Sequence, residues 1–560
     1  MTRIELDMTR KLTLLAVLLT AAMPLFAAQQ RYVVTMKRGV ATSHALRSMP
    51  ADARVRTFAN LSGFAATLTD AQAAELQRSG AVESVRPVVE RTIDSMPASG
   101  PRPVQPTAQT YVEQYVPWGI PSVHAPEVWP VTRGEGVNVA VIDTGIDYRH
   151  PDLAGNYAGG VNFYDPGKEP LDDNKHGTHV SGTIGALDNG LGVVGVAPAV
   201  KLWAVKALGS DGKGTDETVA AGIDWVISKK HEIGGLWVIN MSLGATEESL
   251  IERQACERAI ADNVIVVAAA GNNATNAPHY PGSYEGVISI SAIDDQGNRA
   301  SFSNYGTNVA VSAPGVNVVS TLRTGTNTTA DVQSGSSLID GAGVGGSPFN
   351  EVNALLVDAG LGRPADLVGL NLHGKIALVE RGEIPFREKA RNAKEAGAVA
   401  VVIFNDELHT NDYPGWTMIF ETCQNGVCEV DPAWKDYPFP LTVGIMRADG
   451  LRLRSTAVNA PVAVGYRAAD YGPLNGTSMA TPHATGVVAL LLSLAPDLNP
   501  MQMRSILVQT ATDLGPAGWD VQSAFGELNA LAAAKWVKPS AFGLPPTQPV
   551  PPGRHRSVRP

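Results

Sequence analysis

Three residues spread over the chain have the types needed to cleave an acyl bond by nucleophilic attack. Asp143 follows the apolar run 137–142, His176 precedes a glycine at the expected start of a helix, and Ser478 stands between a glycine and an apolar helical stretch. A serine hydroxyl is a weak nucleophile unless a histidine accepts its proton, and that histidine needs a carboxylate to fix its tautomer and stabilise its charge. Alone, Ser478 could cap a helix and Asp143 could form a turn. Together they predict an Asp-His-Ser hydrolase.

The elements that must position these residues follow an alternating pattern. From about residue 116, apolar runs of strand length alternate with helical stretches such as 217–231, which predicts a mostly parallel sheet with helices on both faces. In such α/β folds, functional side chains gather at the carboxyl ends of the strands. The predicted strands are residues 137–142, 201–208, 236–243, 264–270 and 287–293.

The motifs around the three residues resemble those of the subtilisin-like serine proteases. They read "VIDTGID", "HGTHVSG" and "NGTSMATPHATG", in the Asp, His, Ser order known for that family. The resemblance implies a doubly wound subtilisin-like sheet, preceded by a small α+β propeptide and interrupted by a β-rich α+β inserted domain. It also implies a secreted serine endopeptidase that works through an acyl-enzyme and is made as a self-processing zymogen.

The same resemblance assigns a role to each reactive residue. Ser478 would be the nucleophile, His176 the general base and then acid, and Asp143 the residue that orients His176. In "VVAAAGNNATN", Asn272 would donate its side-chain amide to the oxyanion, as the asparagine of the family's "AAGN" motif does. His179, inside the helix that begins near His176, is expected to pack or to bind neighbouring groups rather than to react.

Two short segments resemble the edges to which this family adds a substrate strand. Such pairing supplies main-chain hydrogen bonds whatever the side chain, so proteins and peptides are the expected substrates. Lys213 could select substrate side chains or point into solvent, and "AAAG" resembles the wall of a roomy, apolar primary specificity pocket. The expected contacts are Gly212, Lys213 and Gly214 in one edge, Ser242, Leu243 and Gly244 in the other, and Ala268, Ala269, Ala270 and Gly271 in the pocket wall.

The resemblance further implies one structural calcium ion (Ca2+). An aspartate in "HPDL", the loop 187–193 and a glutamine upstream match the family's features in spacing. Oxygen atoms from carboxylate, amide and carbonyl groups suit this hard cation. The implied ligands are the side chains of Gln114, Asp152 and Asn189 and the backbone carbonyls of Leu187, Leu191 and Val193.

The N-terminal region predicts export and a removable unit. In residues 1–28, Arg10 and Lys11 precede an apolar run that ends in small residues, the order of a secretory signal; an uncleaved anchor is the alternative, although the run is short for a membrane span. We therefore expect secretion to the extracellular space rather than retention in the periplasm. Residues 29–110 resemble the family's inhibitory propeptide followed by a linker, so the chain would carry its own inhibitor. The mature chain would begin between Asp94 and Glu113.

An insertion separates the two parts of the expected catalytic domain, residues 111–322 and 466–537. Within residues 323–465, "GKIALVERG" and "AVAVVIFNDE" flank "REKARNAKEAGA" in a strand, helix, strand pattern that resembles the protease-associated domain. Such a domain is thought to gate access or engage substrate, and an inert insertion is the alternative. Cys423 and Cys428 lie inside it and could form a disulfide or remain two free thiols.

Two further segments are expected to lack regular structure. The stretch "GAGVGG" (341–346) satisfies the spacing of a dinucleotide fingerprint but does not open a helix after a strand, so we expect a loop. Residues 538–560 are proline-rich, with a basic end and no apolar anchor. We expect them to form an extended, disordered tail.

Composition excludes some partners, and two alternatives to a protease remain. A net charge of -10 over 560 residues, with no basic face, argues against nucleic acid as a partner. No later segment is long and apolar enough to be a stable membrane anchor, and we expect a monomer. A catalytically idle relative that binds proteins would not need Asp143, His176, Asn272 and Ser478 all intact. An esterase would use the same chemistry but would not need peptide-strand edges or a propeptide.

Overall fold

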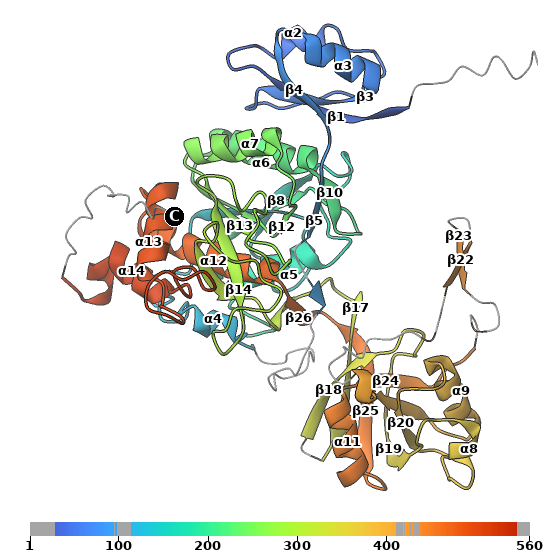
Figure 1. The fold of residues 1–560 in the computed structure, drawn as a ribbon. Helices are drawn as coiled ribbons and strands as arrows, with labels where there is room; N and C mark the ends of the chain where they lie inside the picture. Colours follow the sequence, from blue (N-terminus) through green and yellow to red (C-terminus); the bar gives the residue numbers. More distant parts are fainter. Residues whose placement is uncertain are drawn as a thin grey trace, which may run out of the picture. The chain divides into compact units, whose positions relative to one another are not determined.

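The computed structural model divides into two compact units, residues 1–88 and 89–560 (Figure 1). The expected signal segment and most of the expected linker and maturation region fall on residues that the structure does not describe. The described residues are 28–93, 96–97 and 114–545, apart from 336, 410–417, 419–420, 425–426, 431–433 and 435–436.

The first unit is a four-stranded antiparallel sheet packed against one main helix, which confirms the predicted small α+β unit. Helix α3 (Asp70–Arg78) begins with a capping box, because Thr69 and Gln72 each accept a hydrogen bond from the other's backbone N–H. Its buried Leu76 packs with side chains of the sheet such as Phe64. The strands, in spatial order, are β2 (Arg56–Thr57), β3 (Gly63–Thr69), β1 (Gln29–Met36) and β4 (Val82–Pro87).

The second unit is built on a seven-stranded parallel sheet, which confirms the predicted α/β class. The strand that ends at Asp143 is central in the sheet and is buried at every position, as expected for a strand covered on both faces. In spatial order the strands are β15 (Val311–Pro314), β14 (Ile288–Ile293), β13 (Ile265–Ala269), β11 (Leu236–Met241), β7 (Val137–Asp143), β9 (Lys201–Lys206) and β8 (Tyr157–Asn162).

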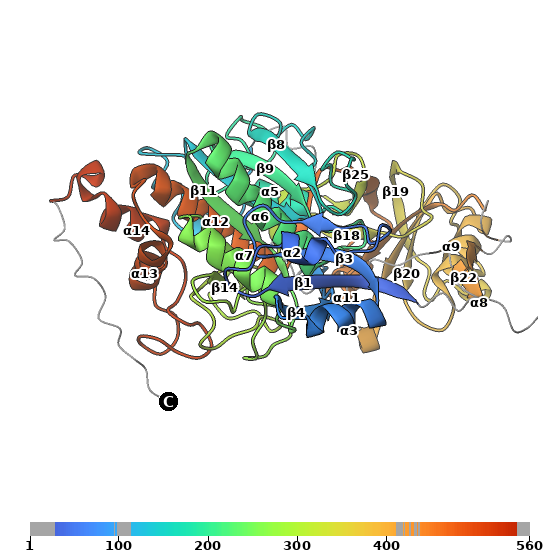
Figure 2. The same ribbon diagram turned by 90° about the horizontal axis from the view of Figure 1, so that it is seen from above.

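Helices cover both faces of this sheet (Figures 1 and 2). Helices α5 (His176–Gly185) and α12 (Thr477–Leu494) pack on the face that carries Val139 of β7, and α6 (Asp216–Ile233) and α7 (Leu250–Ala261) cover the other. Among the described residues, α12 is the one helix long and apolar enough to match a membrane span, and it is 94% buried inside the protein. Its apolar composition therefore matches its place in the core.

The inserted segment forms a closed barrel of seven strands, separate from the parallel sheet. The predicted strand, helix, strand pattern is confirmed by β20 (Ile376–Glu380), α9 (Phe386–Glu395) and β21 (Ala400–Phe404). The other barrel strands are β17 (Asn327–Ser334), β18 (Ser337–Gly343), β19 (Asn350–Asp358), β24 (Leu441–Ile445) and β25 (Pro461–Ala469).

The prediction that residues 341–346 form a loop is wrong for their first half. Gly341 to Gly343 belong to β18, which pairs with β17 and β24. A Cβ at Gly343 would lie 1.9 Å from the ring of Tyr466, so glycine is needed for the strand to pass that ring. The glycines of this stretch therefore serve close packing in the barrel.

The prediction of a disordered tail from residue 538 is wrong for its first residues. Pro539–Phe542 forms a short 3-10 helix directly after α14 (Ala530–Val537), because Phe542 packs against the core of the second unit and Pro539 is buried. The rest of the predicted tail, residues 546–560, lies outside the described residues.

Candidate active site

Asp143 and His176 meet at the carboxyl edge of the sheet, where β7 ends and α5 begins. His176 Nδ1 lies 2.8 Å from Oδ1 and 3.0 Å from Oδ2 of Asp143, and both side chains are buried. A Cβ at Gly177 would lie 2.1 Å from the carbonyl oxygen of Gly145, so the helix can approach the strand end only with glycine there. The carboxylate holds the proton on Nδ1, and the buried Nε2 has no hydrogen-bond partner among the described residues. His176 can therefore accept a proton at Nε2.

Ser478 lies at the second position of α12, buried near the same edge. Its Oγ donates a hydrogen bond to the backbone carbonyl of Ser242 at 2.8 Å, and not to His176. Catalytic hydrogen bonds are often loose in a resting site and tighten only in the reacting complex. Helices α5 and α12 pack against each other, which holds their backbones in place. The hydroxyl of Ser478 can therefore leave Ser242 by rotation about the Cα–Cβ bond of Ser478.

The start of α12 is held by a hydrogen bond that the helix cannot make for itself. Pro482 lies four residues after Ser478 and has no N–H, so the Ser478 carbonyl lacks its usual helical donor. Ser242 Oγ supplies the replacement at 2.9 Å, and Asn240 Nδ2 in turn donates to Ser242 Oγ at 3.1 Å. Ser242 thus positions the helix turn that carries Ser478.

Asn272 is fixed by the residue beside Ser478. Its Oδ1 accepts hydrogen bonds from both the backbone N–H and the Oγ of Thr477, each at 3.0 Å. Thr477 Oγ itself accepts from the backbone N–H of Gly271 at 3.2 Å. With its oxygen occupied in this way, the Asn272 amide turns its NH2 group away from Thr477, in the orientation an amide donor requires.

The two other histidines of the motifs are buried and bind the backbone. His179 Nε2 lies 2.9 Å from the carbonyl oxygen of Val318, and burial lowers the pKa of His179 to about 3. His483 Nδ1 lies 2.8 Å from the carbonyl oxygen of Met479, and burial lowers its pKa to about 4. Both stay neutral at physiological pH, in line with the packing role expected for His179.

The two predicted peptide edges are occupied by a strand of the chain itself. Strand β5 (Glu90–Ile93) pairs antiparallel with β10 (Lys213–Thr215) on one side and with β12 (Leu243–Gly244) on the other. The backbone N–H of Ile93 also donates to the carbonyl of Gly212 at 3.0 Å. These edges therefore accept a peptide in extended conformation between them.

The next described strand after β5 pairs with the strand that leads to Ser478. Strand β6 (Met96–Pro97) pairs antiparallel with β26 (Tyr471–Asn475), the strand that ends three residues before Ser478. The two pairings anchor the chain on either side of the nucleophile. Residues 94 and 95, which connect them, lie outside the described residues.

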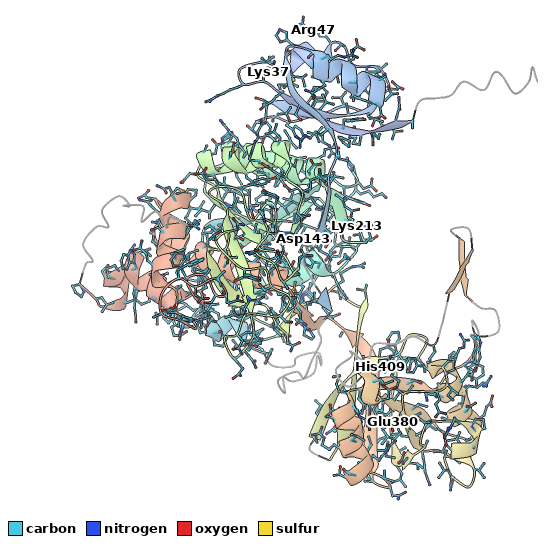
Figure 3. All side chains as sticks on the ribbon, in the orientation of Figure 1. Lys37, Arg47, Asp143, Lys213, Glu380 and His409 are labelled. Atoms are coloured by element: carbon cyan, nitrogen blue, oxygen red, sulfur yellow. The ribbon has the colours of Figure 1, made fainter. Side chains whose placement is uncertain are left out.

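Lys213 and the predicted pocket wall occupy different environments. The Nζ of Lys213, labelled in Figure 3 together with Asp143, lies 3.1 Å from Oε1 of Glu90, and both side chains are more than half exposed. Lys213 thus points outward, toward an acidic side chain of the paired strand. Ala268 and Ala269 end β13, and the wall continues through Ala270 to Gly271, all buried.

The six residues expected to hold calcium lie in one hydrogen-bonded cluster. Asp152 is buried, and its carboxylate accepts from Asn189 Nδ2 at 3.1 Å and from the backbone N–H of Val193 at 2.9 Å. Gln114 Nε2 donates to the carbonyl of Leu187 at 2.9 Å, and the N–H of Leu191 donates to Asn189 Oδ1 at 2.9 Å. The sequence spacing therefore brings carboxylate, amide and carbonyl oxygens together.

A glycine allows the loop of this cluster to close. Gly192 has φ +53°, and a Cβ there would lie 2.2 Å from Asp152 Oδ2 and 2.1 Å from the hydroxyl of Tyr471. Only glycine avoids both contacts. Among the described residues no three histidine, cysteine or acidic side chains converge on one position, so the Asp152 cluster holds one carboxylate beside neutral groups.

The cysteines of the insertion are register partners in a two-stranded ribbon. Cys423 of β22 (Glu421–Gln424) is the direct register partner of Cys428 of β23 (Val427–Val430), but their side chains are not among the described ones. Cys256 is buried and free, and burial raises the pKa of its thiol well above the ordinary value.

One buried ion pair beside the peptide edges was not predicted from the sequence. The guanidinium of Arg91, in β5, binds the carboxylate of Glu252 in α7, and both side chains are fully buried. The two residues are 161 positions apart, so no local pattern pairs them. In contrast, the sequence does indicate that the Ser478 carbonyl needs a donor from outside its helix. Pro482, four residues later, has no N–H to donate to it.

Comparisons with known proteins agree with this geometry. Residues 134–341 and 457–526 match the model of the subtilase family, and residues 344–452 between them match the PA domain. The chain is 46% identical over 209 residues to subtilisin BL of Lederbergia lenta, covering 37% of this chain and 75% of that protein. It is 45% identical over 220 residues to subtilisin DY of Bacillus licheniformis, covering 38% and 78%.

A solved structure is similar over a longer part of the chain. It is the psychrophilic subtilisin-like protease Apa1 from the Antarctic psychrotroph Pseudoalteromonas sp. AS-11, with a TM-score of 0.54 and 29% sequence identity. The match covers 76% of this chain and 99% of that chain.

Proposed function

The chain belongs to the subtilase family of serine endopeptidases and carries an inserted PA domain, and we propose that it is an exported zymogen that cuts itself between Ile93 and Met96. The observation that carries this proposal is the path of the chain through the site. Strand β5 fills the peptide edges, and β6 resumes the pairing beside Ser478. An uncut peptide held on both sides of the nucleophile is in the position of a substrate.

The proposed reaction begins with Ser478. When its hydroxyl leaves the carbonyl of Ser242 and turns to His176, Nε2 can take its proton while Oγ attacks the substrate carbonyl. Asp143 keeps the other imidazole proton on Nδ1 and stabilises the imidazolium. His176 then returns the proton to the leaving amine, and a water molecule activated in the same way hydrolyses the acyl-enzyme.

Asn272 is proposed to stabilise the oxyanion. Thr477, adjacent to the nucleophile, holds the amide oxygen through two hydrogen bonds, so the amide NH2 is oriented before substrate binds. Donors fixed in advance in this way cost no reorganisation when the charge develops. The N-terminal end of α12 adds a favourable dipole for the same charge.

Calcium is proposed as a structural ion in the Asp152 cluster. The residues fit such an ion because a buried carboxylate, two side-chain amides and the carbonyl of Leu187 already lie together around a glycine that leaves room for them, and Leu191 and Val193 belong to the same cluster. Gln114 and Asn189 would each present an amide oxygen after a half-turn of the side-chain amide. A bound ion would tie Gln114 to the loop 187–193.

The proposal also covers export, inhibition by the N-terminal unit, substrates, assembly, the disulfide and the PA domain. Residues 1–28 are proposed to direct export to the extracellular space, and the α+β unit that follows, which is consistent with a propeptide, to act as an intramolecular inhibitor. The enzyme is proposed to act on proteins and peptides as a monomer. Cys423 and Cys428, directly opposed in register, are proposed to form a disulfide. The PA domain is proposed to engage substrate outside the cleft.

Self-processing is tested by producing the wild type and Ser478→Ala separately in a host that lacks other secreted proteases. We expect the wild type to lose all residues up to the interval between Ile93 and Met96, measured by intact mass and N-terminal sequencing, while Ser478→Ala keeps them. Ser301→Ala, at an exposed serine outside the site, is a matched control and should be processed. Loss of the N-terminal unit from both the wild type and Ser478→Ala would contradict self-cleavage.

A further inference from the structure

A buried acidic pocket lies beside the peptide edges and holds one arginine of the paired strand. Arg91 Nε lies 3.0 Å and 3.2 Å from the two carboxylate oxygens of Glu252, and Arg91 Nη2 lies 2.8 Å from Oε2. Both side chains are 0% exposed. Three charge-assisted contacts from a planar guanidinium to one carboxylate form a fork that lysine cannot reproduce.

The walls of this pocket are built from the first turns of two helices. Glu252 is the third residue of α7, and its helix is capped by Ser249, whose Oγ donates to Asp216 at 2.7 Å. Asp216 begins α6 and exchanges hydrogen bonds with the backbone of Val89, just before β5. The hydroxyl of Tyr284 lies 3.1 Å from Oε2 of Glu252. The carboxylate that meets the guanidinium is therefore held rigidly by the catalytic domain itself.

The neighbours of Arg91 in β5 do not enter comparable sites. Glu90 points outward to the exposed Lys213. The side chain of Ile93 lies against Gly212, where an added Cβ would approach it to 2.8 Å. Glu90 is exposed and Thr92 and Ile93 are only partly buried, so Arg91 is the one member of β5 whose side chain is fully enclosed.

We propose that the pocket around Glu252 and Asp216 selects substrates with an arginine at the position that Arg91 occupies in β5. This position stands two residues before Ile93, the last residue paired with the peptide edges. This inference rests on the proposed function, in which β5 leaves with the N-terminal unit after the cut. Departure of Arg91 leaves the carboxylate of Glu252, beside that of Asp216, without its counter-charge. An arginine in the next peptide restores the lost contacts, so the segment released by the proposed cut carries the side chain that the enzyme prefers in its substrates.

The wild-type mature enzyme is tested with internally quenched peptides of the native sequence VVERTIDSMPASG and two variants, Arg91→Leu and Glu90→Gln. We expect Arg91→Leu to lower kcat/KM by about 100-fold or more, because truncating one partner of a buried, hydrogen-bonded charge pair is costly. Glu90→Gln, which alters an exposed pair, should change kcat/KM by less than about 3-fold. The product masses identify the bond that is cut.

A second arm changes the enzyme. The enzyme variant Glu252→Leu also carries Arg91→Leu, so that an apolar side chain fills the pocket while the protein folds. The mature form of this variant should cleave the leucine peptide faster than the arginine peptide. Glu248→Gln, an exposed acid at the entry to α7, is the matched control and should keep the preference for arginine.

The outcomes separate this inference from the proposed function on which it rests. Equal kcat/KM for the arginine and leucine peptides would overturn the arginine pocket, as would an enzyme that degrades denatured casein but leaves the arginine peptide intact. Failure of the mature protein to degrade casein would overturn the proposed function, and the inference with it.

Discussion

Ser478 and Ser242 exchange two hydrogen bonds. Ser478 Oγ donates to the Ser242 carbonyl at 2.8 Å, and Ser242 Oγ donates to the Ser478 carbonyl at 2.9 Å. The second bond compensates for Pro482, which cannot donate to that carbonyl. The first holds the nucleophile at rest against the end of a peptide edge. The pair thus joins the nucleophile's helix to the strand region where substrate binds.

The compensation for Pro482 can be measured by a double-mutant cycle. In a Ser478→Ala background, which prevents self-digestion and keeps the carbonyl, Ser242→Ala should lower the free energy of unfolding by about 1–3 kcal/mol because a buried carbonyl loses its donor. With Pro482→Ala present, residue 482 regains an N–H for that carbonyl. The cost of Ser242→Ala should then fall below about 1 kcal/mol in denaturant titrations. An equal cost in both backgrounds would show that Ser242 does not replace the missing helical bond.

Asn272→Ala should reduce turnover without preventing folding. Removal of one oxyanion donor costs about 10²–10³ in kcat, a magnitude measured on a subtilisin, a member of the same family. KM should change little, because the amide acts on charge that develops only in the transition state. Steady-state kinetics on a peptide substrate measures both constants. Asn273→Ala, at the exposed neighbouring residue, is the control, and an equal loss of kcat in this variant would argue against a specific role for Asn272.

Calcium removal should destabilise the protein through the Asp152 cluster. In Ser478→Ala, which cannot digest itself, added calcium should raise the Tm by an amount that increases with its concentration, and a chelator should reverse the shift. Asp152→Asn and Gly192→Ala should abolish the increase, the first by removing charge and the second by placing a Cβ in the cluster. Asp188→Asn, an exposed acid paired with Arg133, should keep it. A full calcium response in Asp152→Asn would place the ion elsewhere.

Acid should destabilise the fold through a buried histidine. The folded state holds the pKa of His483 at about 4, below its ordinary 6.5, because of burial. The unfolded chain therefore binds the proton more readily, so stability is present above about pH 6.5 and is lost as the pH falls from 6.5 towards 4. The loss is about 3 kcal/mol for this one group.

The measurement compares Ser478→Ala with Ser478→Ala/His483→Gln in denaturant titrations at pH 7, 6, 5 and 4. Glutamine can still donate to the Met479 carbonyl but does not titrate, so its variant should show a shallower decline. His231→Gln, at a half-exposed histidine, should leave the slope unchanged. Parallel pH curves for the His483→Gln variant and its parent would refute the assignment.

The sequence was most informative where one local pattern decides the structure. The apolar run that ends at Asp143, and the glycine after His176, each specify an element end, and the seven-stranded sheet brings these ends together. The alternation of strand and helix also predicted the middle of the inserted domain. Its closure into a barrel could not be predicted, because β17 and β25 pair across more than a hundred intervening residues.

Most of the structural features that the sequence did not predict are contacts between distant segments. Arg91 and Glu252 are ordinary charged residues in their own segments, and only the pairing of β5 with both peptide edges buries them together. The glycines of residues 341–346 suggested a loop because their partner, Tyr466, is far away in the sequence. Composition likewise predicted a disordered tail from residue 538, whereas Phe542 packs against the core.

The central claim, that Ser478 is the nucleophile beside His176, is tested most directly by covalent labelling. The mature protein is treated with a fluorophosphonate, which reacts with a serine hydroxyl only when a neighbouring base activates it, and the label is located by peptide mass mapping. We predict one label per molecule, on Ser478, with loss of casein degradation in proportion to labelling and no label in Asp143→Asn or His176→Ala. A preparation that degrades casein while Ser478 stays unlabelled, or that carries the label on another residue, would contradict the account.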